Sequence, residues 1–577
     1  MSSRSFLFQI ALWLAFVWFF MQCANPVSPT GGPKDVDPPL VVKSDPPNSS
    51  INFNQDKIII TFNEFVKLKN PNQQVLISPP LDEMPDFKIR GKSVVINLNS
   101  KLKDSTTYSI FFGDAIVDIT EDNPLTNYVF AFSTGNVIDS LSLGGSVVNA
   151  FDLKPQEGVY VMLYFTENDT IPTDSLPYQI RPDYITKTDK EGFFRLRNLK
   201  LAPYLLFALK DVNSNYLYDQ PNEEIAFADS LIKPYYVASQ QSDSVIQDTL
   251  MSDSLKMRDM YKDFHQLMLF SQNDSLQRIL QKEVVGRSKF RLVFRYPAVK
   301  PQLFPLNIDT VGGWKFERLN KRGDTLTVWV KDASIDTLEL VVKERDSILD
   351  TTMFVLSKIT DDKKKKSKKK DDITDRIVLS SNAKNRVMEL NMPLVLTFAN
   401  PLKKSNFSNV FWVAGTDTLH GAPFVPNDSL YLTYRLDHAL KENTSYEFIF
   451  PDSTLYDIYN LTNDSLLLAF KVKQPGDYGN LIIDLDLKND GTPYIIQIID
   501  SKETVLYEQL AEKSGKVVFE MLNPGKYRIK AIYDRWKNNR WDTGEYLKKR
   551  QPENVFYFPA EIQVRANWDV EESWQLP

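Results

Sequence analysis

Apolar and polar residues alternate over short runs along much of the chain, and Asn, Asp or Pro separate the runs. Two such runs are KFRLVF at 289–294 and TLELVV at 337–342. Alternation with a period of two is typical of strands buried on one face, and Asn, Asp and Pro shape turns. The 577 residues include 36 Phe, 25 Tyr and 33 Pro but only 21 Gly, which suits many short strands joined by turns. The pattern predicts an all-β fold of tandem β-sandwich modules.

One domain occurs twice, at an offset of 338 residues. KLKDSTTYSIFFGD at 101–114 matches ALKENTSYEFIFPD at 439–452, so that Tyr108 aligns with Tyr446. We expect the two copies at 37–136 and 374–474. In the first copy, SDPPN, then a strand ending in TFN, then LKDSTTYSI, resembles the bacterial Ig-like family of surface-layer proteins. That resemblance implies an extracytoplasmic β-sandwich and no catalytic activity.

A second repeat has an offset of 323 residues. GFFRLRNLKLAPYLLFALKD at 192–211 parallels GKVVFEMLNPGKYRIKAIYD at 515–534. The shared pattern resembles the carboxypeptidase-regulatory, transthyretin-like fold, which is a β-sandwich. We expect its copies at 137–236 and 475–577, so that the same two-domain pair occurs near both ends of the chain.

The region between the pairs has a different pattern. Six apolar residues at 3–4 spacing predict a helical segment at 237–285, with an amphipathic helix at 254–270 that carries His265. The six are Met257, Met260, Tyr261, Phe264, Leu267 and Met268. Strand patterns then predict a degenerate β-sandwich at 286–358, and a Lys-rich run predicts a solvated linker at 359–373.

The N-terminal residues predict export. An apolar run at 5–22 follows Arg4 and ends at Cys23, which is the single cysteine of the chain. This arrangement resembles a bacterial lipoprotein signal, which implies a signal peptide at 1–22 and an acylated Cys23. An uncleaved membrane helix is the alternative, because the run is long enough to span. Residues 23–36 then form a Pro- and Gly-rich tether. Ala24 stands where Asp would favour inner-membrane retention, so the outer membrane is expected and its face stays open.

The composition argues against several functions. A net charge of −6 gives no sign of a nucleic-acid partner. The three His do not have zinc-ligand spacing, and the common hydrolase and nucleotide-binding motifs are missing from the sequence. The chain is therefore predicted not to be an enzyme.

One stretch looks like a calcium loop. Carboxylate and amide oxygens recur at Asp211, Asn213, Asn215, Asp219 and Glu223, and calcium prefers such oxygen ligands. Tyr216, however, replaces the Gly of an EF-type loop, and the second copy keeps only Asp534, Asn538, Asp542 and Glu545. The alternative is a shared turn, shaped by Asp and Asn and held to the sandwich by Tyr218 or Trp541. Calcium is thus a possible cofactor, in the first copy only.

Two further patterns bear on partners. Trp536 and Trp541, with Trp568 and Trp574 further along, are candidate partner or glycan contacts. A recurring Asp-Ser/Thr-apolar tripeptide, as at Asp139-Ser140-Leu141, fits a turn before a strand and also resembles a bacterial O-glycosylation site.

The predicted function is that of a non-catalytic outer-membrane lipoprotein that binds or scaffolds an envelope protein or glycan. The alternatives are an accessory subunit of an outer-membrane assembly or secretion machine and a carbohydrate-binding surface protein.

Overall fold

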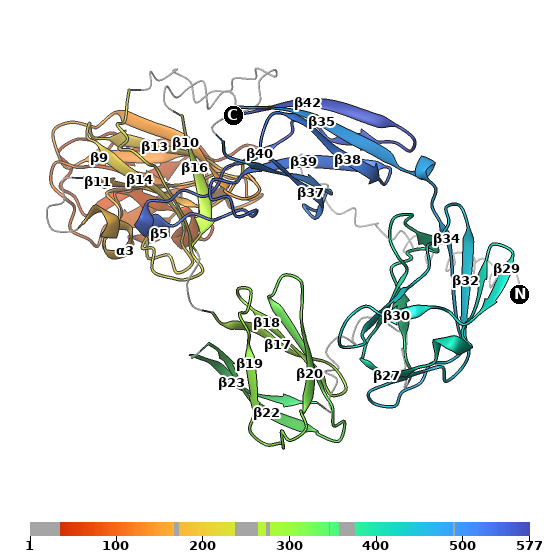
Figure 1. The fold of residues 1–577 in the computed structure, drawn as a ribbon. Helices are drawn as coiled ribbons and strands as arrows, with labels where there is room; N and C mark the ends of the chain where they lie inside the picture. The colour runs from red at the N-terminus through yellow and green to blue at the C-terminus, as the bar shows by residue number, and fades with distance from the viewer. Residues whose placement is uncertain are drawn as a thin grey trace, which may run out of the picture. The chain divides into compact units, whose positions relative to one another are not determined.

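The computed structural model describes residues 35–166, 172–236, 264–272, 277–345, 347–356, 376–488 and 491–577 (Figure 1). Strands make up most of the regular structure, which confirms the all-β fold class. They form β-sandwiches that we number I to V along the chain. The chain divides into two compact units. Unit 1 is Met1–Asn149, Leu153–Ser271 and Tyr546–Lys549, and unit 2 is Ala150–Asp152, Gln272–Glu545 and Arg550–Pro577.

Sandwich I consists of two main sheets with the strand orders β1-β2-β6-β5 and β4-β7-β9. Ile58, Ile60 and Phe62 alternate into the core from β2, as the sequence pattern predicts. The elements are β1 (Val41–Asp45), β2 (Lys57–Phe62), β3 (Val66–Leu68), α2 (Pro71–Gln74), β4 (Leu76–Ser78), β5 (Asp86–Arg90), β6 (Ser93–Asn97), β7 (Thr107–Phe111), β8 (Ile116–Asp118) and β9 (Val129–Ser133).

Sandwich II is built on a curved sheet with the order β12-β11-β14-β15-β16-β10-β13. Leu163, Leu206 and Ala208 are buried in its core. The elements are β10 (Leu141–Asn149), β11 (Tyr160–Phe165), η1 (Thr173–Ser175), α3 (Leu176–Gln179), β12 (Tyr184–Lys187), β13 (Phe193–Leu199), β14 (Tyr204–Lys210), β15 (Glu224–Phe227) and β16 (Phe264–Ser271).

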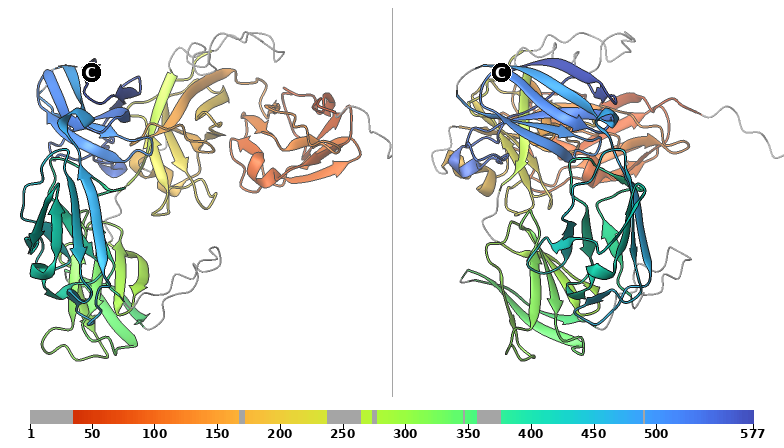
Figure 2. Two further views of the ribbon diagram at one scale, coloured as in Figure 1. Left: turned by 90° about the vertical axis from the view of Figure 1, so that its right-hand side faces the viewer. Right: turned by 45° about the vertical axis from the view of Figure 1, so that its right-hand side comes forward.

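The predicted helix is wrong over its described part. Residues 264–271 form β16, which pairs in parallel with β10 and antiparallel with β15 (Figures 1 and 2). Leu267 and Leu269 point into the core of sandwich II, and His265 lies on this strand. The short apolar run LMLF at 267–270 fits either a strand or a buried helix by periodicity, and here the open edges of β10 and β15 decide for the strand. Residues 279–286 are also strand (β17), and 237–263 lie outside the described residues.

Sandwich III pairs a sheet of order β17-β18-β21-β20 with one of order β19-β22-β23. Alternate residues of β18 and β22, such as Leu292 and Leu340, fill its core. The strands are β17 (Ile279–Gly286), β18 (Lys289–Phe294), β19 (Gln302–Pro305), β20 (Lys315–Leu319), β21 (Thr325–Val330), β22 (Thr337–Glu344) and β23 (Ser347–Val355).

Sandwich IV has sheets of order β24-β26-β31-β30 and β25-β34-β32-β28-β29. The Tyr446 hydroxyl accepts a hydrogen bond from Lys441 N at 2.9 Å, as the Tyr108 hydroxyl does from Lys103 N at 2.8 Å in sandwich I. The elements are β24 (Leu379–Ser381), β25 (Val387–Met388), β26 (Val395–Phe398), β27 (Leu402–Ser405), η3 (Phe407–Asn409), β28 (Phe411–Ala414), β29 (Asp417–His420), β30 (Phe424–Pro426), β31 (Thr433–Leu436), β32 (Ser445–Phe450), β33 (Leu455–Asp457) and β34 (Leu466–Val472).

Sandwich V combines sheets of order β38-β35-β42 and β37-β36-β39-β40, with β41 beside β39. β42 pairs in parallel with β35, as β16 does with β10, so β16 is the equivalent of the last strand of the chain. The elements are η4 (Pro475–Asp477), β35 (Gly479–Leu487), β36 (Tyr494–Ile499), β37 (Val505–Ala511), β38 (Gly515–Leu522), β39 (Gly525–Tyr533), η5 (Tyr546–Lys548), β40 (Val555–Tyr557), β41 (Ile562–Val564) and β42 (Asp569–Leu576).

Several predicted segments lie outside the described residues. These are the signal peptide at 1–22, Cys23 with most of the tether, and the Lys-rich linker. Within the described ranges no helix is both long and apolar enough to cross a membrane.

Candidate functional site

The loop between β14 and β15 gathers all five predicted calcium ligands. Asp211 accepts hydrogen bonds from the backbone N–H groups of Asn213 (3.0 Å), Ser214 (2.6 Å) and Tyr216 (2.8 Å). Tyr216 adopts a left-handed φ of 63° and packs its ring edge-on against Tyr160. The backbone of the loop therefore wraps around the Asp211 carboxylate.

Glu223 closes the same loop from its other end. Its side chain is 1% exposed and accepts from Val212 N at 3.2 Å, Asp219 N at 3.0 Å and Gln220 N at 3.0 Å. The amides of Asn213 and Asn215 donate to the Asp219 carboxylate at 3.0 and 2.8 Å. The carboxylates of this loop thus already accept hydrogen bonds from the loop itself.

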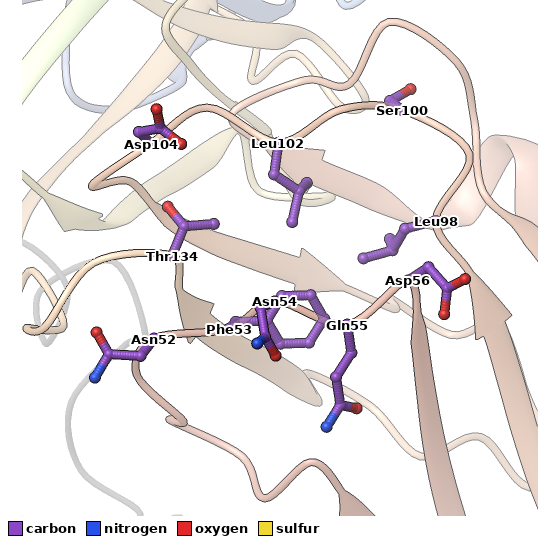
Figure 3. Close-up of a pocket in the computed structure, with 10 residues that line it drawn as sticks. All are labelled: Asn52, Phe53, Asn54, Gln55, Asp56, Leu98, Ser100, Leu102, Asp104 and Thr134. Carbon is purple, nitrogen blue, oxygen red and sulfur yellow. The ribbon is translucent and has the colours of Figure 1, made fainter.

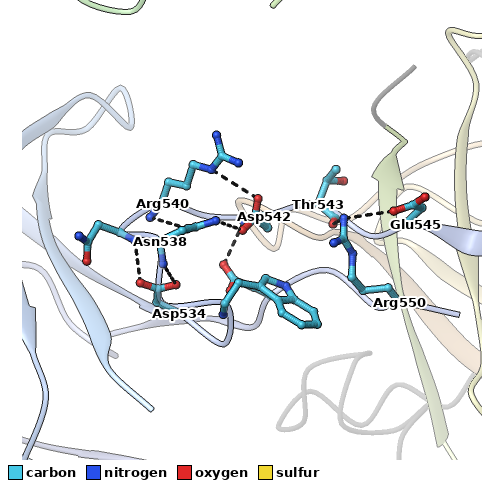
Figure 4. Close-up of polar contacts among 10 residues, drawn as sticks. Asp534, Asn538, Arg540, Asp542, Thr543, Glu545 and Arg550 are labelled. Carbon is cyan, nitrogen blue, oxygen red and sulfur yellow. Dashed lines mark hydrogen bonds and ion pairs between the residues drawn. The ribbon is translucent and has the colours of Figure 1, made fainter. Parts of the chain in front are cut away.

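The loop after β39 in sandwich V repeats this arrangement (Figure 4). Asp534 is fully buried and accepts from Asn538 N at 3.0 Å and Asn539 N at 2.8 Å. Asn538 donates its side-chain amide to Asp542, as Asn215 does to Asp219. Asn539, which aligns with Tyr216, also has a left-handed φ, of 60°. The two copies share one backbone turn.

The equivalent of Glu223 in the second loop is Glu553, which the sequence analysis did not name. Glu553 is 2% exposed and accepts from Trp536 N at 3.1 Å and Asp542 N at 2.9 Å. Burial raises the pKa of Glu553, and the nearby Asp534 and Asp542 raise it further. Glu545 instead forms an ion pair with Arg550 at 3.5 Å (Figure 4). The second loop is longer than the first between these two acidic residues, so Glu553 lies further along the chain from Asp542 than Glu223 does from Asp219.

This geometry favours the turn over the metal site as the common role of both loops. Across the described ranges, no three His, Cys, Asp or Glu side chains gather as a metal site. Calcium binding by Asp211, Asn213, Asn215, Asp219 and Glu223 stays a prediction, since Asn and carbonyl oxygens can also serve calcium.

The four candidate Trp residues have different surroundings. Trp541 donates its Nε1–H to Glu553 O at 3.0 Å and packs against the Ile532 and Val555 side chains, so it holds the turn in place. Trp574 is buried against Phe558. Trp536 is 45% exposed under the Arg550 guanidinium, and Trp568 is 62% exposed.

A groove of about 480 Å³ lies at one end of sandwich I (Figure 3). Phe53, Leu98 and Leu102 gather in its middle, and Asp56 and Asp104 lie at opposite ends. The Thr134 hydroxyl, which also lines this groove, donates a hydrogen bond to Lys103 O at 2.7 Å. Phe53 is itself a core residue at 7% exposure, so this groove offers a ligand little aromatic surface.

A second groove, of about 570 Å³, lies within unit 2 where sandwiches IV and V meet. It is lined by Leu390, Pro475, Gly476, Tyr478, Asn480, Glu520, Met521, Asn567, Trp568 and Asp569. Beside it the Glu389 carboxylate accepts hydrogen bonds from Lys473 at 2.8 Å and from the Tyr478 hydroxyl at 2.6 Å. Burial opposes ionisation of Glu389, but these two hydrogen bonds lower its pKa.

Strand β37 of sandwich V is an exposed sheet edge. It ends its sheet, and six of its seven residues are exposed, among them Val505, Leu506, Tyr507 and Leu510 at 37–44%. By strand register the equivalent strand in sandwich II is β12, where Tyr184 takes the place of Tyr507. Tyr184 is 2% exposed because it packs in the core of sandwich II, against Phe165 and Tyr204. The next residue of β12, Ile185, is fully buried outside that core, and its backbone N–H donates to Ser78 Oγ of sandwich I at 3.0 Å. The sequence pattern predicts both β12 and β37 as strands. Only the packing of sandwich I against sandwich II shows that β12 is covered, whereas β37 is exposed.

The sheet of sandwich I that packs on β12 has an exposed equivalent in sandwich IV. In sandwich I, Ser109 is 1% exposed and its hydroxyl donates to the Asn198 side chain of sandwich II at 3.0 Å. In sandwich IV the matching sheet carries an exposed apolar row across three strands, formed by Phe411, Ile449 and Leu467. Exposed rows of this kind are uncommon unless they bind something.

Comparisons with known proteins support the first module. Residues 35–134 match the family of bacterial Ig-like domains. No curated protein sequence matches the chain.

Several solved structures share local likeness with it. The TIE protein of Bacillus anthracis is 10% identical, with a TM-score of 0.15, over 94% of this chain and 76% of that one. BcpA, the major pilin subunit of Bacillus cereus, is 9% identical, with a TM-score of 0.14, over 76% and 99%. A Bacteroides ovatus SGBP-B, solved with a mixed-linkage heptasaccharide, is 10% identical, with a TM-score of 0.17, over 74% and 91%. TM-scores this low support no conclusion about this chain.

Proposed function

We propose that the protein is a non-catalytic, lipid-anchored binding scaffold of the outer membrane, which captures an extended segment of another envelope protein along β37. One observation carries the proposal. β37 is an open apolar sheet edge, whereas its duplicate β12 is short and covered. The lipid anchor rests on Cys23 and the Pro-rich tether, and the regulatory-like character of sandwiches II and V rests on sequence resemblance.

The chemistry of β37 suits a partner strand. Its sequence, VLYEQLA, contains no Pro or Lys, which commonly protect sheet edges from pairing, and its single charged residue is Glu508. A partner strand would satisfy backbone groups along the edge, and alternate side chains would pack on Leu506 and Leu510. An extended polypeptide segment is the ligand that uses both features at once.

The role of the β37 edge can be tested by introducing charged side chains on it. The double variant Leu506→Lys, Leu510→Lys should leave stability within about 0.5 kcal/mol, because both side chains are already exposed. It should reduce capture of the partner at least tenfold in crosslinking from intact envelopes, because the side chains of the bound partner strand lose their apolar contacts with Leu506 and Leu510. Leu201→Lys is the matched control, at a loop residue that is 78% exposed. Undiminished capture by the double variant would rule out β37 as the binding edge.

The anchor can be tested at Cys23. Cys23→Ser should release the protein from the membrane fraction if the lipid is the attachment, and should leave it bound if residues 5–22 form an uncleaved helix.

The identity of the captured partner tests the first of the two alternative functions, an accessory subunit, and the carbohydrate-binding alternative needs a separate sugar-binding test. Capture of a membrane-embedded barrel protein would favour an accessory subunit of an assembly or secretion machine. The amphipathic helix expected to support that role is a strand over 264–270, so the alternative now depends on the crosslinking alone.

A further inference from the structure

We infer that the groove between sandwiches IV and V binds a short neutral glycan, with Trp568 as the stacking platform. This rests on the proposed role as a binding protein of the envelope and names a second ligand class for it. The groove is about 570 Å³, which lies within the range of about 300–1,000 Å³ typical of ligand sites.

Trp568 is held out of the core by a fixed backbone. Asn567 N donates to Tyr478 O at 2.7 Å, and Asn480 N donates to Trp568 O at 3.0 Å. At Gly479 a Cβ would lie 2.3 Å from Arg565 O and 2.9 Å from Trp568 O, so only glycine permits this close approach. The indole nevertheless stays 62% exposed. A large aromatic ring presented on a rigid loop is a pre-organised contact surface.

The groove adds a second apolar contact at Met521. This residue has a left-handed φ of 55°, which is uncommon for residues other than Gly, Asn, Asp and His. Asn198, at the same position of sandwich II, has a φ of 58° and uses its amide to bond with Ser109 and Asp139. The second copy keeps the strained backbone but replaces the amide with a side chain that lines the groove.

Polar groups surround the two apolar side chains. Asp569, Glu520 and Asn567 line the groove and are exposed. The Asn480 side-chain amide donates to the Asp569 carboxylate at 2.7 Å and accepts from Met521 N at 3.0 Å, so the position of this carboxylate is held. Carboxylate and amide oxygens can accept from neighbouring sugar hydroxyls while the apolar face of the ring stacks on the indole.

The local charges disfavour an anionic ligand. Glu520 and Asp569 repel anions. The nearby Lys473 ammonium is neutralised by its ion pair with Glu389 at 2.8 Å, so the charges of the groove exclude an anion and leave a neutral sugar or a cation. The exposed indole and the surrounding hydrogen-bond acceptors favour the sugar. A Lys-rich peptide is the rival that the test must separate.

The test uses the full chain purified in a zwitterionic detergent, because a maltoside would itself compete for a sugar site. Binding of neutral hexasaccharides of glucose, xylose and mannose, in α and β linkages, is measured by calorimetry. At least one should bind, and Trp568→Ala should weaken it at least about tenfold, as expected for an aromatic hot spot. Trp536→Ala, at a second Trp that is exposed within the described ranges, should bind like the wild type.

Three results would overturn the inference. These are no binding by any hexasaccharide, equal binding by Trp568→Ala, and binding of hexalysine in place of the sugars. Trp568→Phe separates folding from contact, since it should keep the thermal unfolding of the wild type and lose only part of the affinity. The capture and Cys23 experiments give their results independently, so failure here leaves the proposed scaffold role intact.

Discussion

Sandwiches I and II and sandwiches IV and V contain the same pair of folds, but the two pairs are assembled differently. In the first pair, three hydrogen bonds cross the contact between the sandwiches. Ser109 and Thr107 of sandwich I donate to Asn198 and Asp139, and Ser78 accepts from Ile185 N of sandwich II. In the second pair, the contact runs through the Glu389 carboxylate, with Lys473, Tyr478 and Asn523 around it. The sheet face used by the first pair is left open in the second.

Two charged residues mark the surfaces that stay open in the second pair. Glu447 stands where Ser109 is buried, and Glu508 stands where Ile185 is buried. Closing the second pair like the first would bury both carboxylates, which costs several kcal/mol for each unpaired charge. A duplication has thus given one pair that is closed by packing and one whose apolar row and strand edge stay accessible.

The largest expected effect comes from transferring that charge to the first pair. Ser109→Glu should open the face between sandwiches I and II at a cost of about 3–5 kcal/mol, because the new carboxylate is buried without a partner. Hydrogen exchange of β12 and of residues 134–140 measures the opening.

The reciprocal change is the control. Glu447→Ser alters an exposed residue and should leave exchange unchanged. Normal protection of β12 in Ser109→Glu would contradict the account of the two pairs by charge.

A smaller difference is expected between the two Asp/Asn loops. Asp534→Ala removes a fully buried carboxylate and leaves the N–H groups of Asn538 and Asn539 without their acceptor, which should cost about 2 kcal/mol. Asp211→Ala affects three N–H groups, but water reaches this partly exposed site, so about 1 kcal/mol is expected. Thermal unfolding of the two variants, with exchange of the loop amides, compares them, and equal losses would show that burial does not distinguish the loops.

The smallest expected effect is the dependence of stability on pH through Glu389. The lowered pKa of Glu389 means that its contribution is present above the ordinary value of 4.5 and is lost as the pH falls through the folded-state pKa. Glu389→Gln should therefore lower stability by about 1 kcal/mol at pH 7 and make little difference at pH 3. Unfolding temperatures of both proteins across this range measure it. A gap that persists at pH 3 would mean that the carboxylate charge is not what holds the second pair.

The duplicated turn shows how far the sequence reaches toward the site. The offset of 323 correctly matched Asp211 with Asp534 and Asn215 with Asn538, since side chains that shape a turn act within a few residues. It failed at Glu553, which follows an insertion. The signal was present, because Glu223 and Glu553 both lie four residues before the aromatic residue that ends the next strand, Phe227 and Tyr557.

The Trp candidates show the opposite limit. Trp536, Trp541, Trp568 and Trp574 are equivalent in sequence reasoning, yet one is buried, one holds a turn and two are exposed. Exposure depends on what packs against a side chain from distant parts of the chain, which local pattern does not record.

The sequence by itself determined the strand-rich fold, the duplication and the shared turn, because alternation, repeat spacing and Asp/Asn chemistry are local properties. Only the tertiary structure decided that residues 264–271 complete sandwich II as β16, since a short apolar run becomes a strand when neighbouring strands offer it open edges. It also decided that β12 is covered while β37 is open. The physical reason is that the burial of a residue depends on which two surfaces meet, and the sequence pattern of one strand does not record the surface that packs on it. Glu447 and Glu508 lie on the two surfaces that stay open.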